Sequence, residues 1–192
     1  MRTLSAIEEE AVVCDAHKLM NEIEPLLERW SNFYLLTSAA AATLIGLMFV
    51  VVTLVAERRV DVKDTAKIHV YFTPTVVYFA SVLGVAALLI FPNHTWLTAT
   101  LCTCLVGVVG LLYSGTNLIG GDKKSFVELR DRVPYAVVPF GAYSLLVLGG
   151  VLLLHNPQRG LTLVAVGMLS LLAVAIRNSW AIAIFVSTLP KA

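Results

Sequence analysis

Long uncharged stretches dominate the pattern of hydrophobic and polar positions along this chain. No Asp, Glu, Lys or Arg occurs between Ile68 and Gly121. One membrane-crossing helix needs about 20 consecutive apolar residues, so this stretch has room for two of them. The polar segment from Pro92 to Thr95 gives a natural break between the two. The pattern therefore predicts an all-α, polytopic membrane protein rather than a soluble domain.

The same pattern predicts a bundle of five transmembrane helices. We expect these spans at about 30–56, 68–91, 96–119, 135–154 and 161–189. Pro74 lies about two turns into the second span and is expected to kink it. The chain then divides into a membrane domain of residues 30–192 and an N-terminal segment of residues 1–29.

The N-terminal segment differs from the rest because acidic residues interrupt its apolar positions. Ser5-Ala6-Ile7-Glu8 matches the capping-box pattern of a helix start. Apolar positions then recur loosely on one side between residues 4 and 24. This predicts an amphipathic helix that Pro25 ends or kinks. We expect the helix to lie on the membrane surface or on the end of the bundle, or to dock a partner protein.

Composition agrees with a membrane location. Of 192 residues, 58% are hydrophobic and 14% are charged, whereas typical soluble chains carry about 25% charged residues. The chain has no basic cluster of the kind that binds nucleic acid. Lys and Arg concentrate after the first and third predicted spans. The positive-inside rule places those segments in the cytoplasm, which puts the N-terminus outside and the C-terminus inside.

Small residues mark one face of the first predicted span. Ser38, Ala42 and Gly46 follow one another at intervals of four residues. In lipid, helices associate through close packing of small side chains, because little hydrophobic force drives them together. This face is predicted to contact another helix, either of the same chain or of a second copy.

Arg177 is the charged residue that falls inside a predicted span. Its side chain could extend to lipid phosphates. It could also pair with Glu57, Asp61 or Asp122, which the predicted topology places at the same membrane face. A third hypothesis places one Arg177 from each copy in a ring around a pore, where the positive charge would favour anions.

Uncharged polar side chains within the spans are further candidates for a pore lining or for helix packing. These are Asn178, Asn117, Tyr78 and Thr73. No Asp or Glu lies within a predicted span, which argues against proton transfer by carboxylates in the membrane. Nucleotide-binding loops and zinc-protease motifs are also missing. The favoured expectation is that the protein is not an enzyme.

A metal site on the outer side is a further hypothesis. Cys14 and His17 lie three residues apart, on one face of the predicted N-terminal helix. The predicted topology places His94 and His155 on the same side of the membrane. Such a set could hold zinc or copper. The favoured expectation is nevertheless that the protein holds no cofactor.

The first predicted span resembles that of a group of small bacterial integral membrane proteins, most of them without a known function. The shared features are Trp30-Ser31-Asn32-Phe33-Tyr34, the alanine-rich stretch from Ser38 to Ala42, and Gly46-Leu47-Met48-Phe49-Val50. Arg177-Asn178-Ser179-Trp180 is similar to a late Arg-Asn-Ala-Trp-Asp segment of the group, with Ala181 in place of the Asp. The resemblance implies a protein of the bacterial inner membrane and brings no mechanism.

The sequence supports three functional hypotheses. The first is a homo-oligomeric pore or transport protein for a small ion or solute, because five helices alone seldom enclose a wide aqueous path. The second is an accessory or regulatory membrane subunit without transport, which the acidic N-terminal segment would suit. The third is a membrane metalloenzyme that uses the outer histidines and Cys14.

Overall fold

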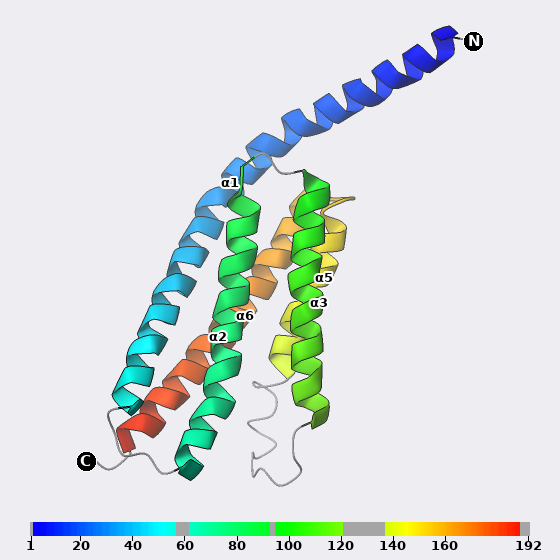
Figure 1. Ribbon diagram of the computed structural model, residues 1–192. Helices are drawn as coiled ribbons and strands as arrows, with labels where there is room; N and C mark the ends of the chain where they lie inside the picture. Colours follow the sequence, from blue (N-terminus) through cyan, green and yellow to red (C-terminus); the bar gives the residue numbers. More distant parts are fainter. Residues whose placement is uncertain (1, 57–61, 93–94, 121–136, 189–192) are drawn as a thin grey trace.

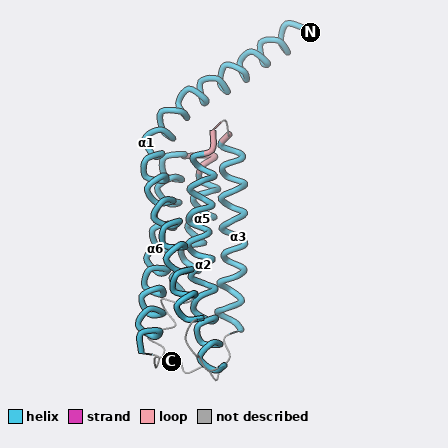
Figure 2. The backbone as a smooth tube through the Cα atoms, turned by 60° about the vertical axis from the view of Figure 1, so that its left-hand side comes forward, coloured by secondary structure: helices cyan, strands magenta, loops and turns pink. Residues whose placement is uncertain are grey.

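The computed structural model describes residues 2–56, 62–92, 95–120 and 137–188, which form five helices and no strand (Figure 1). In chain order these are α1 (Arg2–Ala56), α2 (Val62–Ile90), α3 (Trp96–Gly120), α5 (Val138–Leu152) and α6 (Pro157–Thr188). Successive helices run in opposite directions and form one bundle (Figures 1 and 2). We call the end from which α1 projects the upper end, and the end at which α6 finishes the lower end (Figure 1).

Four of the helices are long and apolar enough to cross a membrane. Their apolar segments are Glu28–Leu54, Phe72–Ile90, Trp96–Thr116 and Pro157–Ile184. Large apolar side chains on the outer surface also fit a membrane location: Leu36 is 72% exposed and Leu112 is 67% exposed. Lipid solvates such side chains, whereas large apolar patches on a soluble protein cause aggregation. The prediction of an all-helical membrane protein is confirmed to this extent.

The predicted span at 135–154 corresponds to α5, the shortest of the five helices. Its 15 described residues correspond to about 22 Å of helix. The hydrocarbon core of a bilayer is about 30 Å thick. Length and composition therefore identify four of the five predicted spans, and α5 is a shorter apolar helix.

Helix α1 continues through Pro25 without interruption. The expectation that Pro25 could end the helix is therefore wrong, and the predicted boundary at residues 29 and 30 falls inside α1. An interior proline removes one helical hydrogen bond and favours a bend, but it does not force the helix to end. The first part of α1 leaves the bundle at an angle to the rest (Figures 1 and 2). Side chains before residue 26 lie outside the described set, so the amphipathic face stays a prediction.

Helix α2 also continues through a proline, Pro74. Figure 1 draws α2 as one unbroken helix, and the kink expected at Pro74 stays a prediction. Local capping explains where the next helix begins. At the start of α3, the Thr95 N–H donates to Thr98 Oγ1 at 3.0 Å, and the Thr98 N–H donates to Thr95 Oγ1 at 3.4 Å. This reciprocal cap fixes the start of α3 close to the predicted residue.

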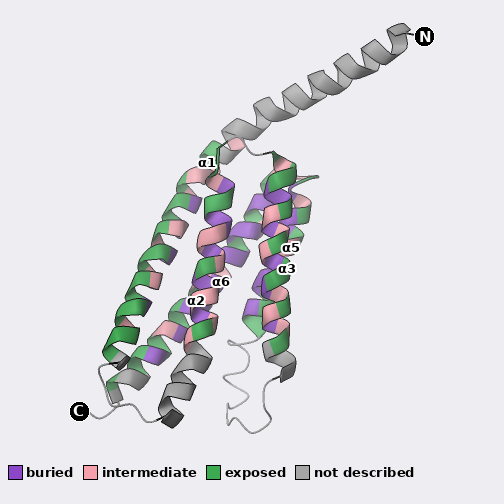
Figure 3. Cartoon of the chain, viewed as in Figure 1, coloured by how far each residue is buried: buried purple, intermediate pink, exposed green. Residues whose placement is uncertain are grey.

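Buried side chains line the inward faces of the helices, and exposed ones face outward (Figure 3). On α1 the inward face contains Tyr34, Thr37, Ala41 and Met48, at the intervals of three, four and seven residues that mark one helix face. These side chains, with partly buried neighbours such as Phe33 and Leu44, pack α1 against the core within the described part of the chain.

The predicted small-residue face of α1 points largely outward. Ala42 and Gly46 are exposed, and Ser38 is half-buried. A Cβ atom built on Gly46 would meet no neighbouring atom within 4 Å. None of the described helices packs closely on Gly46, and contact of this face with a second copy stays a prediction.

Helix α5 lies between α3 and α6 and approaches both closely. A Cβ on Gly149 would lie 2.9 Å from Val164 N of α6, and a Cβ on Gly150 would lie 2.7 Å from Cys104 Sγ of α3. Adjacent residues of a helix point about 100° apart, so Gly149 allows close approach of α6 and Gly150 allows close approach of α3. Small residues let helices approach in this way in lipid. This packing fixes the register of α5 against α3.

Candidate functional site

Three buried hydroxyl groups on one face of α3 have no hydrogen-bond partner within the described part of the chain. They belong to Thr100, Thr103 and Ser114, whose side chains are at most 6% exposed. Gly107 and Gly110 are buried on the same face. The five residues recur at intervals of three and four, so they form a continuous line along the helix.

Many hydroxyl groups elsewhere on the described helices bond to their own backbone. Thr37 Oγ1, for example, donates to Phe33 O at 2.7 Å. This local bond satisfies a Ser or Thr side chain inside a helix without any outside partner. The three α3 hydroxyls do not make it. Each unpaired hydroxyl in an apolar interior costs about 1–3 kcal/mol, and a bound water or another hydrogen-bonding molecule would remove that cost.

Tyr143 of α5 packs across this face of α3. A Cβ atom on Gly110 would overlap the Tyr143 ring, so the ring occupies the space that a side chain at Gly110 would fill. Tyr143 Oη lies 2.9 Å from Ser81 Oγ of α2. Ser81 Oγ donates its own proton to Val77 O at 2.8 Å, so Tyr143 is the donor in the bond between the two hydroxyls. Tyr143 therefore connects α2, α3 and α5 at one level of the bundle.

Two residues of α5 divide the line of hydroxyls in two, because Val147 covers Gly107 and Tyr143 covers Gly110. Thr100 lies ten residues before Gly110, or about 15 Å toward the upper end, and Ser114 lies four residues after it, or about 6 Å toward the lower end. We call the line of Thr100, Thr103 and Ser114, together with Tyr143 where it covers Gly110, the α3 seam. The seam is a row of hydrogen-bonding groups enclosed by apolar helices.

Asn178 of α6 is a further buried polar residue without a hydrogen-bond partner among the described residues. Its side chain is 0% exposed, and neither its amide nitrogen nor its amide oxygen makes a hydrogen bond. Gly167, eleven residues earlier on α6, packs against the backbone oxygen of Ala142, 2.9 Å from a Cβ built on the glycine. Asn178 therefore lies about 16 Å below the level of Ala142, on the same side of Tyr143 as Ser114.

The other uncharged polar residues that the sequence suggested do not lie together in the structure. Tyr78 is buried, and its ring centroid lies 6.3 Å from that of Tyr143. Thr73 is exposed on α2. The side chain of Asn117 lies outside the described set. The structure therefore associates Tyr78 with the level of Tyr143 and places Thr73 on the outer surface.

Arg177 is exposed on α6, whereas its neighbour Asn178 is buried. The proposed acidic partners Glu57, Asp61 and Asp122 lie outside the described residues. Pairing with them, extension to lipid phosphates and a ring of positive charge between copies all stay predictions.

The described side chains do not assemble a metal site. Among them, no three His, Cys, Asp or Glu residues lie close enough to hold a metal ion. His155 is exposed in the turn after α5. His94 and the side chains of Cys14 and His17 lie outside the described set, so the metal hypothesis stays a prediction.

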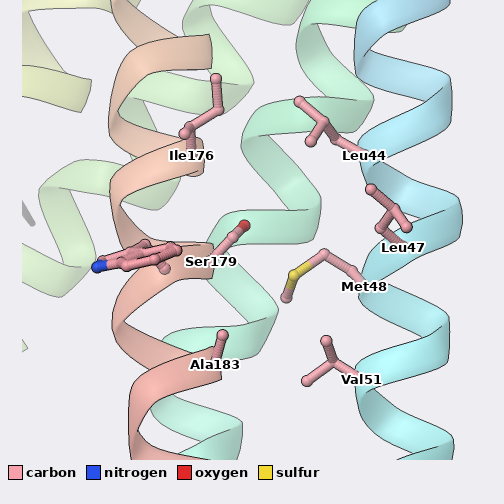
Figure 4. Close-up of a pocket in the computed structure, with 8 residues that line it drawn as sticks. Leu44, Leu47, Met48, Val51, Ile176, Ser179 and Ala183 are labelled. Atoms are coloured by element: carbon pink, nitrogen blue, oxygen red, sulfur yellow. The ribbon is translucent and has the colours of Figure 1, made fainter.

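An apolar groove of about 240 Å³ runs between α1 and α6 in the lower half of the bundle (Figure 4). Its walls are Leu44, Leu47, Met48 and Val51 from α1, and Ile176, Ser179, Trp180 and Ala183 from α6. The lining has two polar side-chain groups: Ser179 Oγ, which donates to Ala175 O at 2.8 Å, and the indole N–H of Trp180. The groove presents apolar surface and no titratable group, so we place the candidate site at the α3 seam.

Sequence reasoning missed the α3 seam. The available signal was the run of small and hydroxyl residues at intervals of three and four from Thr100 to Ser114, which is the spacing of one helix face. Ser81 and Tyr143 carried no comparable local signal, because their role depends on contacts between helices.

Comparison of the chain with protein-family models gives no match, and comparisons with curated proteins and with solved structures give none either. We therefore infer the function from the geometry of the site.

Proposed function

We propose that this protein forms a pathway for a small solute across the membrane, and that the α3 seam is the pathway. The supporting observation is the row of buried, unbonded hydroxyl groups of Thr100, Thr103 and Ser114 on one helix face. Packing alone would favour apolar side chains there, because an unpaired hydroxyl destabilises an apolar interior. A row of hydroxyls is useful where a hydrogen-bonding molecule moves along it.

The chemistry of the seam favours a small neutral solute, such as water or a short polyol. Hydroxyl groups donate and accept hydrogen bonds, but they carry no charge. Pathways selective for ions use rings of charged side chains or many converging carbonyl oxygens. An anion pathway through Arg177 is the alternative, and it would have to lie between copies, because Arg177 is exposed on the single chain.

The proposal includes α5 as a fifth membrane crossing. α5 runs antiparallel to α3 and α6 and packs against both (Figure 1). Five crossings place the two termini on opposite sides of the membrane. With the basic segments in the cytoplasm, the N-terminus is outside and the C-terminus inside.

We further propose that identical copies assemble through α1. Ala42 and Gly46 are exposed on that helix, next to Ser38. A helix of a second copy could approach this face closely, and such contacts drive helix association in lipid.

A liposome assay tests the pathway. Purified protein is reconstituted, and shrinkage of the vesicles after an osmotic step measures the flux of water and glycerol. Thr103→Val and Ser114→Ala remove seam hydroxyls with little change in shape, and we expect both to lose most of the protein-dependent flux. Thr43→Val is the matched control, because Thr43 is exposed and bonds to Ala39 O at 2.8 Å. Equal flux with and without folded protein would reject the proposal.

An accessory subunit is the second candidate function. The observation that favours it is the first part of α1, which projects from the bundle away from the other described helices (Figures 1 and 2). A photo-crosslinking residue placed between positions 2 and 24 of the full chain should then capture one foreign protein in cells. Crosslinks to lipid alone would reject this candidate.

A further inference from the structure

Backbone atoms of α5, as well as its side chains, lie against the α3 seam. A Cβ atom built on Gly107 would lie 2.6 Å from the Val147 side chain and 3.1 Å from the Val147 backbone nitrogen. A Cβ on Gly150 would lie 3.5 Å from the carbonyl oxygen of Thr100. A side chain can change its rotamer in place, but a backbone atom of a helix moves only with the helix. Rotation of a single side chain therefore does not uncover the seam.

The residues of α5 that cover the seam share one face of that helix. Tyr143, Val147 and Gly150 follow one another at intervals of four and three residues, which places them in one line. Tyr143 lies over Gly110, Val147 lies over Gly107, and Gly150 packs on α3 further toward the upper end. One displacement of α5 relative to α3 would therefore uncover the whole line together.

The contact between α3 and α5 contains little hydrogen bonding. Among the described residues, its polar contact is the bond from Cys104 Sγ to Val147 O at 3.7 Å, and a thiol is a weak donor. The Tyr143 hydroxyl bonds to Ser81 of α2 and not to α3. Separation of α3 from α5 therefore breaks close apolar packing without breaking a strong hydrogen bond between these two helices.

Helix α5 packs more closely on α6 than on α3. A Cβ built on any of three glycines at the α5–α6 contact would lie 2.8–2.9 Å from a backbone atom across the contact; these are Gly149, Gly160 and Gly167. The nearest backbone atom at the α3 contact is 3.1 Å away, at Gly107. A short connection, residues 153–156, also joins α5 to α6. The two helices therefore form one unit, and the contact with α3 is the looser side of α5.

We propose that the α3 seam opens when α3 separates from α5, while α5 stays packed on α6. In the closed arrangement Val147 and Tyr143 interrupt the row of hydroxyls. In the open arrangement the face of α3 from Thr100 to Ser114 is continuous and available to the solute. This inference rests on the proposed function, because it describes how that pathway opens. It adds which helix contact breaks and which one holds.

Two matched disulfide locks test the inference. A Cβ on Gly107 of α3 would lie 3.4 Å from Leu146 Cβ, and a Cβ on Gly167 of α6 would lie 3.4 Å from Leu145 Cβ. Both distances are close to the roughly 3.5–4.5 Å between the Cβ atoms of a disulfide. After the three native cysteines are replaced by Ala, Gly107→Cys with Leu146→Cys joins α5 to α3. Gly167→Cys with Leu145→Cys joins α5 to α6 and is the control.

The liposome assay is repeated with each lock closed by copper phenanthroline in air and opened again by a reductant. We expect the lock on α3 to remove most of the protein-dependent flux of water and glycerol, and reduction to restore it. The lock on α6 should leave the flux unchanged. If the first lock prevents folding, Gly150→Cys replaces it, because its Cβ position lies 2.7 Å from the native Cys104 Sγ. Cys14 and Cys102 are then the residues replaced by Ala.

Labelling of a cysteine in the seam measures the separation without transport. Ser114 is 1% exposed, and it lies about one turn below Gly110 on the covered face. Ser114→Cys is added to each oxidised lock and to the cysteine-free protein, and a membrane-impermeant thiol reagent is supplied on both sides of the vesicles. We expect labelling without a lock and with the lock on α6. The lock on α3 should abolish it.

The outcomes separate the opening from the pathway. Flux that the lock on α3 leaves unchanged would keep the pathway and overturn the opening between α3 and α5. Loss of flux with the lock on α6 would also overturn this opening, because α5 would then have to leave α6. Labelling that only the lock on α3 prevents, with no flux in any vesicle, would support the separation and reject the pathway. A cysteine at 114 that never reacts would overturn the separation.

Discussion

The Tyr34 hydroxyl donates a hydrogen bond of 3.2 Å to the carbonyl oxygen of Leu161, 127 residues further along the chain. Tyr34 is 1% exposed, and the bond joins α1 to α6 near the upper end of the bundle. The apolar groove between the same two helices opens in the lower half. The first and last described helices are thus joined by a specific polar contact at one end and by apolar side chains at the other.

Tyr34→Phe should lower the free energy of unfolding modestly. The substitution keeps the buried ring and removes one hydrogen bond between helices, which contributes about 0.6 kcal/mol on average in a membrane protein. Equilibrium unfolding in mixed detergent micelles measures the change. Tyr34→Ala, which also removes the ring, should cost several times more. Equal losses for the two variants would contradict a specific role for the hydroxyl.

Gly149→Ala should destabilise the bundle more than Gly150→Ala. The new methyl at 149 would meet backbone atoms, Val164 N at 2.9 Å and Gly160 O at 3.0 Å, whereas the methyl at 150 would first meet the movable Cys104 Sγ. Overpacking of this kind costs about 1–3 kcal/mol. The unfolding midpoints of the two variants give the comparison.

Gly46→Ala is the control for these glycine variants. Because no atom lies near its Cβ position, the change should be neutral or stabilise α1 by up to about 1 kcal/mol. Combining Gly150→Ala with Cys104→Ala should recover part of the lost stability. A loss at Gly46→Ala as large as at Gly149→Ala would contradict the packing described for α5.

Gly46→Leu should weaken the proposed assembly of copies. A large side chain at the centre of the small-residue face prevents close approach of a second helix. Native mass spectrometry in mild detergent measures the oligomer. Ala87→Leu, at an exposed position of α2, is the matched control and should leave the mass unchanged. A monomeric wild-type protein would remove the basis for assembly through α1.

Asn178→Leu should raise the free energy of unfolding. The amide is fully buried and has no hydrogen-bond partner, so an apolar side chain of similar size removes a cost of about 1–3 kcal/mol. The unfolding midpoint in detergent measures the effect, with Thr116→Val at an exposed position as the control. A lower midpoint for Asn178→Leu would instead mean that the amide binds water or a solute in the folded protein.

The positions of the apolar helices could be predicted because they depend on local sequence. α3 begins at Trp96, as the sequence pattern predicts, because Thr95 and Thr98 cap the helix shortly after Pro92. The described part of α1 likewise extends to Ala56, where the first span was predicted to end. Of the two outcomes predicted at Pro25, an end of the helix does not occur, because a proline disfavours a helix interior without excluding it.

The site could not be predicted because it depends on how helices face one another. Ser38, Ala42 and Gly46 form a clear small-residue pattern, yet the sequence does not show whether this face turns toward the chain's own bundle. The structure turns Tyr34 and Met48 inward instead. The contact between Tyr143 and Gly110 likewise depends on the register of α5 against α3, which glycines on both sides of α5 determine.

The pairing of α5 with α6 has a consequence for how the protein is made. The described part of α5 has 15 residues, and one crossing needs about 20. The turn between α5 and α6 is tight, with the Asn156 N–H bonded to Leu152 O at 2.8 Å. As the proposed fifth crossing, α5 would therefore enter the membrane as one half of a hairpin during translation. The strongly apolar α6, synthesised after it, would draw both helices in together.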